Sequence, residues 1–427
     1  MLRKMMKKSF LSTLLLVVLS LPLSAQYLFG FGEVKTGLEV LRDKHFAGLE
    51  GKRVGLVTNP SGVDRQLRST IDILFEAPGV NLVALYGPEH GVRGDVWAGG
   101  KVADEKDPKT GLPVYSLYGA TRKPTAKMLE GIDIMVYDIQ DVGTRSYTFI
   151  STLGLVMRAC AEQGIEVMVL DRPNPLGGLK IEGCCVEKGF HSFVSEFSIP
   201  YVYGLTVGEL ASLINEEGLN CGQKGDEAPL KCKLTVVPMR GWRRYMIYRD
   251  TGLPWVPPSP NIPDMRSALC YPSAGLVGEF NDYVSIGVGY TLPFQVFAAE
   301  WIDADALKAK LDSYAPAGTA FRTVHFTPFS GSKAGKLLHG VQYYYTDYEG
   351  AIITLTQFYV MQAIHELYPE HNPFPGSTRN AMFDKVSGTD YVRKSFADRL
   401  KVADICDFWM KDAEKFRALS KKYYIYK

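Results

Sequence analysis

The sequence predicts an α/β protein with a mostly parallel, doubly wound sheet and a second, smaller α/β domain. From about residue 34 to 175, short β-rich apolar runs alternate with helical patterns, as in parallel sheets with helices on both faces. A proline-rich segment at residues 253–263 then interrupts all periodicity before a second set of strands and helices begins. A chain of 427 residues usually holds more than one domain. We therefore predict a first domain over residues 34–263 and a second over 264–427.

In the first domain, the apolar runs predict strands at residues 53–58, 80–86, 132–137, 165–170 and 234–238. Helices are expected at residues 146–163, where Gly164 provides a C-cap, and at 206–215. No G-x-G-x-x-G motif follows the first strand, so a dinucleotide-binding site is disfavoured.

In the second domain, we expect strands at residues 294–298 and 322–326, with helices at 303–314, 354–367 and 391–424. The segment at 253–263 is compatible with a stiff linker between the domains. Because it carries Ser259 and Asn261 beside a tryptophan, it is equally compatible with a wall of a binding site.

The N-terminus has the pattern of a secretory signal peptide. A basic stretch at residues 3–8 precedes an apolar run at 10–21 and small residues that end at Ala25. We predict cleavage after Ala25 and export to the periplasm or the extracellular space. Without residues 1–25, 44 Lys and Arg face 46 Asp and Glu, a net charge of about −2. This balance does not support nucleic-acid binding, and no other stretch predicts stable membrane insertion after signal cleavage.

The seven cysteines are an odd number and form no C-x-x-C pair, which gives little support for a metal site. Cys221 and Cys232 bracket a polar segment and could form a disulfide in an oxidising compartment. A divalent ion held by His90, Asp138 and Asp141 is an alternative, but a single histidine lies there. We therefore predict neither a metal nor another cofactor.

Polar side chains follow the predicted strands at the points where the strands end. Because ligands of open parallel sheets bind outside the carboxyl ends of the strands, we expect a site at this edge. The candidate residues in chain order are Asn59, Glu89, His90, Arg93, Asp138, Gln140, Asp141, Arg145, Asp171, Arg172 and Asn174.

These residue types are suited to cleaving a glycosidic bond. Carboxylates in a partly apolar cleft can have pKa values that are moved apart, so that one serves as an acid and another stays ionised. Arg145 and Arg172 could clamp a carboxylate on the substrate with paired hydrogen bonds. A structural role is the alternative, because Asp171 and Arg172 could form a local ion pair and Asp138 could cap a turn.

Four motifs resemble the exo-β-N-acetylmuramidase family in sequence and in order. They are GPEHGVRG at residues 87–94, YDIQDVGTR at 137–145, LDRPNPLGG at 170–178 and PSPNIP at 258–263. The resemblance extends from about residue 37 to the C-terminus. It implies a Rossmann-like catalytic domain, a smaller C-terminal domain and a cleft between the two.

The resemblance also implies a glycosidase that removes N-acetylmuramic acid from the non-reducing end of peptidoglycan fragments. Its partners would be peptidoglycan-derived muropeptides or disaccharides, encountered in cell-wall turnover or salvage. On this basis Glu89 is the expected catalytic carboxylate, with His90 beside it. The other candidates would bind substrate, and the lactyl carboxylate of muramic acid would account for the arginines.

The sequence departs from patterns common in this family at two places. Residues 278–281 and 287–290 lack an arginine and two threonines that many relatives carry, and Tyr203 stands where many have histidine. Two alternatives therefore stay open: a glycosidase acting on another acidic or amino sugar, and a cell-wall sugar-binding protein without catalysis. The sequence leaves the stereochemical outcome, retention or inversion, open as well.

Overall fold

The computed structural model describes residues 33–94, 105–217, 231–280 and 282–427. The predicted signal peptide and Cys221 lie outside these residues. No helix within the described ranges is long and apolar enough to cross a membrane.

A seven-stranded sheet forms the centre of the first domain, in the order β3-β4-β2-β1-β5-β6-β7. All neighbouring strands are parallel except β3, which runs antiparallel to β4 at one edge. The bounds are β1 Arg53–Thr58, β2 Asn81–Gly87, β3 Glu105–Lys106, β4 Pro113–Ser116, β5 Ile134–Asp138, β6 Glu166–Leu170 and β7 Leu234–Val237. Strands β3 and β4 were not predicted because they are short. Strand β4 also begins at a proline and is only half-buried at alternate residues.

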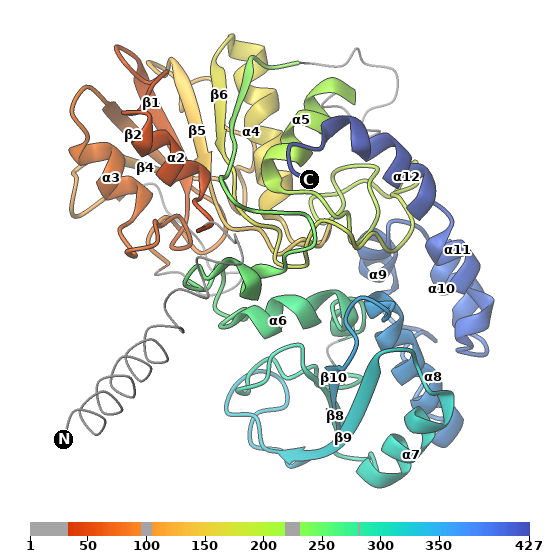
Figure 1. The fold of residues 1–427 in the computed structure, drawn as a ribbon. Coiled ribbons are helices and arrows are strands. Elements are labelled where there is room, and N and C mark those ends of the chain that lie inside the picture. The colour runs from red at the N-terminus through yellow and green to blue at the C-terminus, as the bar shows by residue number, and fades with distance from the viewer. Residues whose placement is uncertain (1–32, 95–104, 218–230, 281) are drawn as a thin grey trace, which may run out of the picture.

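Helices cover both faces of this sheet, which confirms the doubly wound prediction (Figure 1). Helices α4 (Phe149–Gln163) and α5 (Val207–Glu217) pack on one face, and α2 (Gly37–Asp43) and α3 (Thr70–Glu76) on the other. The interior strand β5 is buried along its whole length, as expected for a strand covered on both sides. Helix α4 ends at Gly164 with φ of 69°, the left-handed conformation that glycine adopts without strain.

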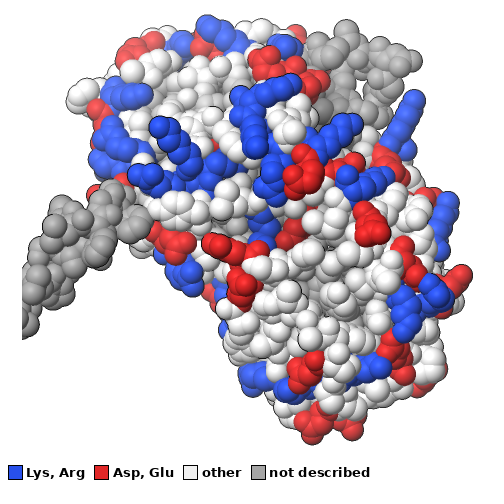
Figure 2. Space-filling view, turned by 45° about the vertical axis from the view of Figure 1, so that its right-hand side comes forward, with Lys and Arg blue, Asp and Glu red and all other residues white. Residues whose placement is uncertain are grey.

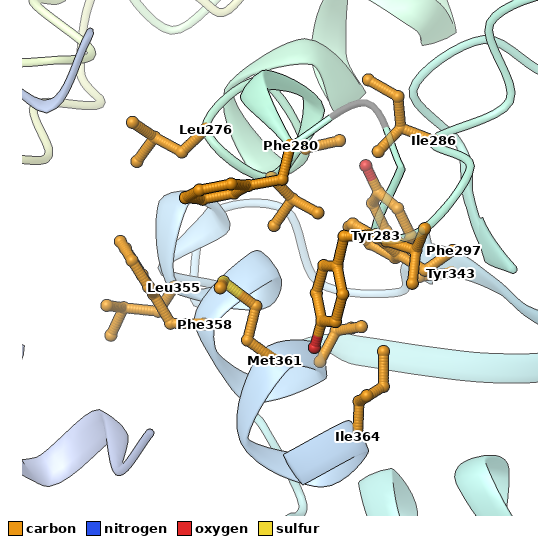
Figure 3. Packing of buried hydrophobic residues seen from close by; sticks show 14 of the residues in the cluster. Leu276, Phe280, Tyr283, Ile286, Phe297, Tyr343, Leu355, Phe358, Met361 and Ile364 are labelled. Atoms are coloured by element: carbon orange, nitrogen blue, oxygen red, sulfur yellow. The ribbon is translucent and has the colours of Figure 1, made fainter. Parts of the chain in front are cut away.

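The second domain contains a three-stranded antiparallel sheet in the order β8-β10-β9. Its strands are β8 Val296–Ala299, β9 Thr319–Phe326 and β10 Leu338–Tyr345, and helices α7 (Ala304–Tyr314) and α8 (Thr356–Leu367) pack beside them. Figure 3 shows the core between sheet and helix, where Phe297, Phe358 and Tyr283 contribute aromatic rings. Helices α6 (Met265–Cys270) and α9 (Asn380–Ser387) lie toward the first domain (Figure 1).

The single helix expected over residues 391–424 is wrong. The structure has three short helices there, α10 (Tyr391–Phe396), α11 (Cys406–Met410) and α12 (Ala413–Ser420). Leu400 has φ of 45°, a left-handed conformation that is incompatible with a continuous helix, and its side chain is fully buried. Burial of this side chain stabilises a bend that helical periodicity alone does not reveal.

The C-terminal residues return to the first domain after completing the second. Phe416 belongs to the same apolar cluster as α4 and α5. The Tyr426 hydroxyl donates to Asp171 Oδ2 at 2.5 Å and accepts from the backbone N–H of Met239 at 2.8 Å. The backbone N–H of Ile425 donates to Glu209 at 2.9 Å. The core of the first domain therefore includes residues that come after the second domain in the chain.

Buried polar contacts also join the two domains. Glu182 of the first domain accepts hydrogen bonds from the backbone and hydroxyl of Thr354, both at 2.9 Å. The indole N–H of Trp409 donates to the same hydroxyl, and its ring packs 5.7 Å from that of Tyr201. On the face in Figure 2, charged side chains of both signs are interspersed, and broad uncharged areas occur on the second domain.

Candidate active site

The loops after β1, β2, β4, β5 and β6 meet at the carboxyl edge of the large sheet. The strand register places Gly87 opposite Ser116, and Thr58 opposite Asp138, so these loops begin at the same level. Glu89 comes two residues after the end of β2 and is half-buried. His90 is buried and has φ of 76°, so the chain turns sharply directly after Glu89. The edge predicted from the sequence is therefore where Glu89 lies.

Two tyrosines that the sequence analysis did not select lie close to Glu89. Tyr118, two residues after β4, has its hydroxyl hydrogen-bonded to the Glu89 carboxylate. Burial, together with the charge of Glu89, raises the pKa of Tyr118 to about 12, so its hydroxyl stays a donor. Burial also raises the pKa of Tyr147, with Glu89 and Asp141 adding to the effect. Tyr118 could have been selected if β4 had been recognised, because it follows that strand as Glu89 follows β2.

Asp141 supplies a second carboxylate at the site. Its Oδ2 accepts hydrogen bonds from the Tyr203 hydroxyl and from the backbone N–H of Gly143. Its buried Oδ1 has no hydrogen-bond partner among the described residues. Burial raises the pKa of Asp141 to about 6, although the Tyr203 hydroxyl opposes this shift. Asp141 is thus a carboxyl group with one oxygen available and a proton that it exchanges at mildly acidic pH.

Titration of Asp141 should make the free energy of unfolding depend on pH between about pH 4 and 6. An unfolded aspartate has a pKa of about 4, so between that pH and about 6 the folded state alone holds the proton. The stabilisation from Asp141 is therefore fully present below pH 4 and is lost as the pH rises through 6. The free energy of unfolding, measured with urea, should be plotted against pH for the wild type and for Asp141→Asn. The slopes of the two plots in this range should differ by the equivalent of about one proton.

Tyr203→Phe is the matched variant for this measurement. It removes a hydrogen-bond donor to the ionised carboxylate, which should raise the pKa of Asp141 further. The pH range in which stability depends on Asp141 should therefore extend to higher pH. An unchanged window in Tyr203→Phe, or equal slopes in the wild type and Asp141→Asn, would contradict the assignment.

Gln140 lies beside Asp141 with its amide fixed. The amide N–H₂ group donates to the backbone carbonyls of Asp141 at 2.8 Å and Pro173 at 2.7 Å. Its buried Oε1 has no hydrogen-bond partner within the described ranges. Gln140 and Asp141 are the two predicted binding residues that keep a buried acceptor for a ligand.

Arg145 does not serve as the expected clamp for a substrate carboxylate. Its side chain is fully buried, and its guanidinium donates to four backbone carbonyls and one hydroxyl. The acceptors are Cys184 O at 2.7 Å, Ile199 O at 2.7 Å, Val386 O at 3.1 Å, Ser387 O at 2.8 Å and Ser195 Oγ at 3.3 Å. Because these acceptors belong to both domains, Arg145 joins the domains instead of facing a ligand.

Arg172 and Asp138 are structural as well. Arg172 Nε donates to Asp138 Oδ1 at 2.5 Å, and a second N–H donates to Val63 O at 2.8 Å. The other Asp138 oxygen accepts from Thr70 at 2.5 Å. Both members of the pair are buried, so neither is available to a sugar. The local Asp171–Arg172 pair considered above is replaced by this ion pair across the sheet.

Asp171 and Asn174 also have their hydrogen bonds satisfied within the fold. Asp171 accepts from Thr206 and Gly208, both at 2.8 Å, in addition to Tyr426. Asn174 donates to the carbonyl of Leu205 at 2.8 Å and accepts a backbone N–H. They fix the loop after β6 from behind the site.

Two further candidates have structural partners. Arg93 forms a paired ion bridge with Asp107, with distances of 2.7 and 3.0 Å. Asn59 donates to the carbonyl of Pro258 at 3.1 Å and thereby attaches the proline-rich segment to the end of β1. That segment consequently forms a wall of the site: Ser259 is buried near the Tyr147 hydroxyl, and Asn261 is half-exposed beside it.

The carboxylates at this edge are not arranged as a metal site. Among the described residues, no group of three or more His, Cys, Asp or Glu side chains is placed to hold an ion. The proposed ligand Asp138 is occupied by Arg172. This edge holds the Glu89 carboxylate, hydrogen-bonded to Tyr118, and the Asp141 carboxyl group, whose pKa is raised. Such a pair is suited to acid–base chemistry.

Comparison with known proteins identifies matching families over both domains. A family model described as Exo-beta-N-acetylmuramidase NamZ, N-terminal, matches residues 54–266, and its C-terminal counterpart matches residues 269–426. The chain is 44% identical over 394 residues to the peptidoglycan beta-N-acetylmuramidase NamZ of Bacillus subtilis (strain 168), with 92% of each protein covered.

Two crystal structures of DUF1343 family proteins from Bacteroides fragilis NCTC 9343 are also similar. The first is 54% identical with a TM-score of 0.87, covering 92% of this chain and 99% of that chain. The second is 32% identical with a TM-score of 0.73, covering 93% and 99%. The likeness extends over both domains in each case.

Proposed function

Because the chain belongs to the exo-β-N-acetylmuramidase NamZ family, we propose that it is a glycoside hydrolase that releases β-linked N-acetylmuramic acid from the non-reducing end of peptidoglycan fragments. The observation that carries the proposal is the position of Glu89. It lies at the carboxyl edge of the sheet with Tyr118 bonded to its carboxylate and Tyr147 and Asp141 nearby.

Hydrolysis of a glycosidic bond needs a proton for the leaving oxygen and a water molecule for the anomeric carbon. In the proposed reaction, the carboxyl group of Glu89 gives its proton to that oxygen as the bond to the anomeric carbon breaks, and the water that adds to the anomeric carbon gives up a proton to the carboxylate of Asp141. Asp141, whose pKa is raised to about 6, provides the second carboxyl group with its open Oδ1. Tyr118 and Tyr147 surround Glu89 with hydroxyl groups that stay protonated at neutral pH.

The direct test is the release of free sugar from a disaccharide of N-acetylmuramic acid β-linked to N-acetylglucosamine. We expect equimolar N-acetylmuramic acid and N-acetylglucosamine, and no activity on chitobiose, which lacks the lactyl group. Release from chitobiose alone would favour another amino sugar as substrate, and binding without release would favour a sugar-binding protein. Either result would overturn the proposal.

We also propose that the protein works outside the cytoplasm, on the grounds of the signal-peptide pattern at residues 1–25. Peptidoglycan fragments arise at the cell wall, so an exported hydrolase would meet its substrate there. N-terminal sequencing of the protein from an exporting host should begin at Gln26. A mature protein that keeps residues 1–25 would contradict export by cleavage.

A further inference from the structure

Besides Arg65 and Arg68 after β1, which pair with Glu33 and Glu76, four arginines follow the other strands of the active-site edge: Arg93 after β2, Arg122 after β4, Arg145 after β5 and Arg172 after β6. Three of them are occupied. Arg93 and Arg172 are held by carboxylates, and Arg145 is held by backbone carbonyls. A substrate that carries a carboxylate needs a cation at this edge, and these three cannot provide it.

Arg122 differs from the other three in exposure and in partners. Its side chain is exposed, and no ion pair or hydrogen bond to it occurs among the described residues. Its guanidinium carbon lies 4.3 Å from the centre of the Phe193 ring, which restricts the side chain without using its N–H groups. The ring contact therefore holds the Arg122 side chain in place, while its N–H groups have no acceptor among the described residues and can bind one on a ligand.

Arg122 is also close to the catalytic carboxylate. It lies four residues after Tyr118 on the loop that follows β4, and β4 is the neighbour of β2, which leads to Glu89. The charge of Arg122 acts on the hydroxyl of Tyr118, and that hydroxyl is bonded to Glu89. The next residue, Lys123, points to a different partner, because its ammonium binds Glu162 of α4 at 2.7 Å.

We infer that Arg122, held over Phe193, binds the lactyl carboxylate of the substrate and sets the preference for an acidic sugar. The inference rests on the proposed function and specifies its substrate recognition. A guanidinium presents two parallel N–H groups to a carboxylate, a geometry that lysine cannot reproduce. The contact selects the substrate and leaves the bond-breaking step to Glu89.

The test compares two chromogenic β-glycosides of N-acetylmuramic acid, one with the free lactyl carboxylate and one with the lactyl group converted to a neutral methylamide. We expect the wild type to prefer the carboxylate. Arg122→Ala should lower kcat/KM for the carboxylate by about 10- to 100-fold, chiefly through KM. It should change kcat/KM for the methylamide by less than about 3-fold. Arg122→Lys should recover part of the preference.

Lys123→Ala is the matched control, because it removes the adjacent positive charge and should keep the preference for the carboxylate. Equal losses on both substrates in Arg122→Ala, or no loss on either, would overturn the inference while leaving the proposed function intact. A wild type that hydrolyses neither glycoside would instead overturn the proposed function.

Discussion

Glu89→Gln is expected to lower kcat on a chromogenic glycoside of N-acetylmuramic acid by about 10²- to 10⁴-fold. Glutamine keeps the size of the side chain and can still bond to the Tyr118 hydroxyl, but it cannot donate a carboxyl proton to the leaving oxygen. The loss should therefore appear in kcat, with KM changed little, because ground-state contacts are retained.

The melting temperature of Glu89→Gln should stay within a few degrees of the wild type, since a half-buried isosteric change costs little. Glu130→Gln is the matched control. Glu130 is exposed and precedes β5, so it lies at the opposite end of that strand from the site. Full activity in Glu89→Gln would exclude Glu89 as the proton donor.

Arg145→Lys is expected to be strongly destabilising for a conservative change, lowering the free energy of unfolding by about 1–3 kcal/mol. The guanidinium satisfies four buried carbonyls from separate segments and one hydroxyl, whereas an ammonium has three donors. At least one buried carbonyl would lose its partner, and each such loss costs about 1–3 kcal/mol. Urea unfolding followed by tryptophan fluorescence measures the change.

Arg68→Lys is the control for Arg145→Lys. Arg68 pairs with Glu76, and both side chains are more than half exposed, so this exchange should have little effect. Because Val386 and Ser387 belong to the second domain, Arg145→Lys should also weaken the contact between domains. If Arg145→Lys were as stable as the wild type, the buried carbonyls would have found other hydrogen-bond donors. That result would contradict the role proposed for the Arg145 guanidinium.

The strands of the first domain could be predicted because they are buried on both faces. A strand such as β5 is a continuous apolar run in the sequence, and the polar residues directly after it indicate the functional edge of the sheet. The short strand β4, second from the edge of the sheet, has no such run, so Tyr118 and Arg122 were not recognised. The bend at Leu400 depends on burial of the Leu400 side chain in the core of the second domain. This is a tertiary contact, and local periodicity in the sequence does not predict it.

The position of the candidate residues at the carboxyl edge of the sheet follows from the sequence, whereas the hydrogen-bond partners of those residues do not. Motif order predicts that Glu89, Gln140 and Asp141 lie at one edge of the sheet, because the ends of parallel strands share that edge. It could not separate Arg145 and Arg172, whose N–H groups bind acceptors inside the fold, from Arg122, whose N–H groups bind no acceptor in the part of the chain that the structure describes. Residue type gives the chemistry that a side chain can perform, while its hydrogen-bond partners determine whether it is free to perform it.

The return of the C-terminus has a consequence for biosynthesis. Asp171 and Glu209 bind Tyr426 and Ile425, which are synthesised only after the whole second domain. The first domain therefore cannot reach its final packing until residues 425 and 426 have been made, even though all seven strands of its described sheet are complete by residue 237. We expect a chain that ends at residue 420 to be digested by protease within its first domain under conditions where the full chain survives. In an exported protein, this late packing keeps the precursor loosely folded until residues 425 and 426 have been made. A loosely folded chain can still be threaded through a membrane channel.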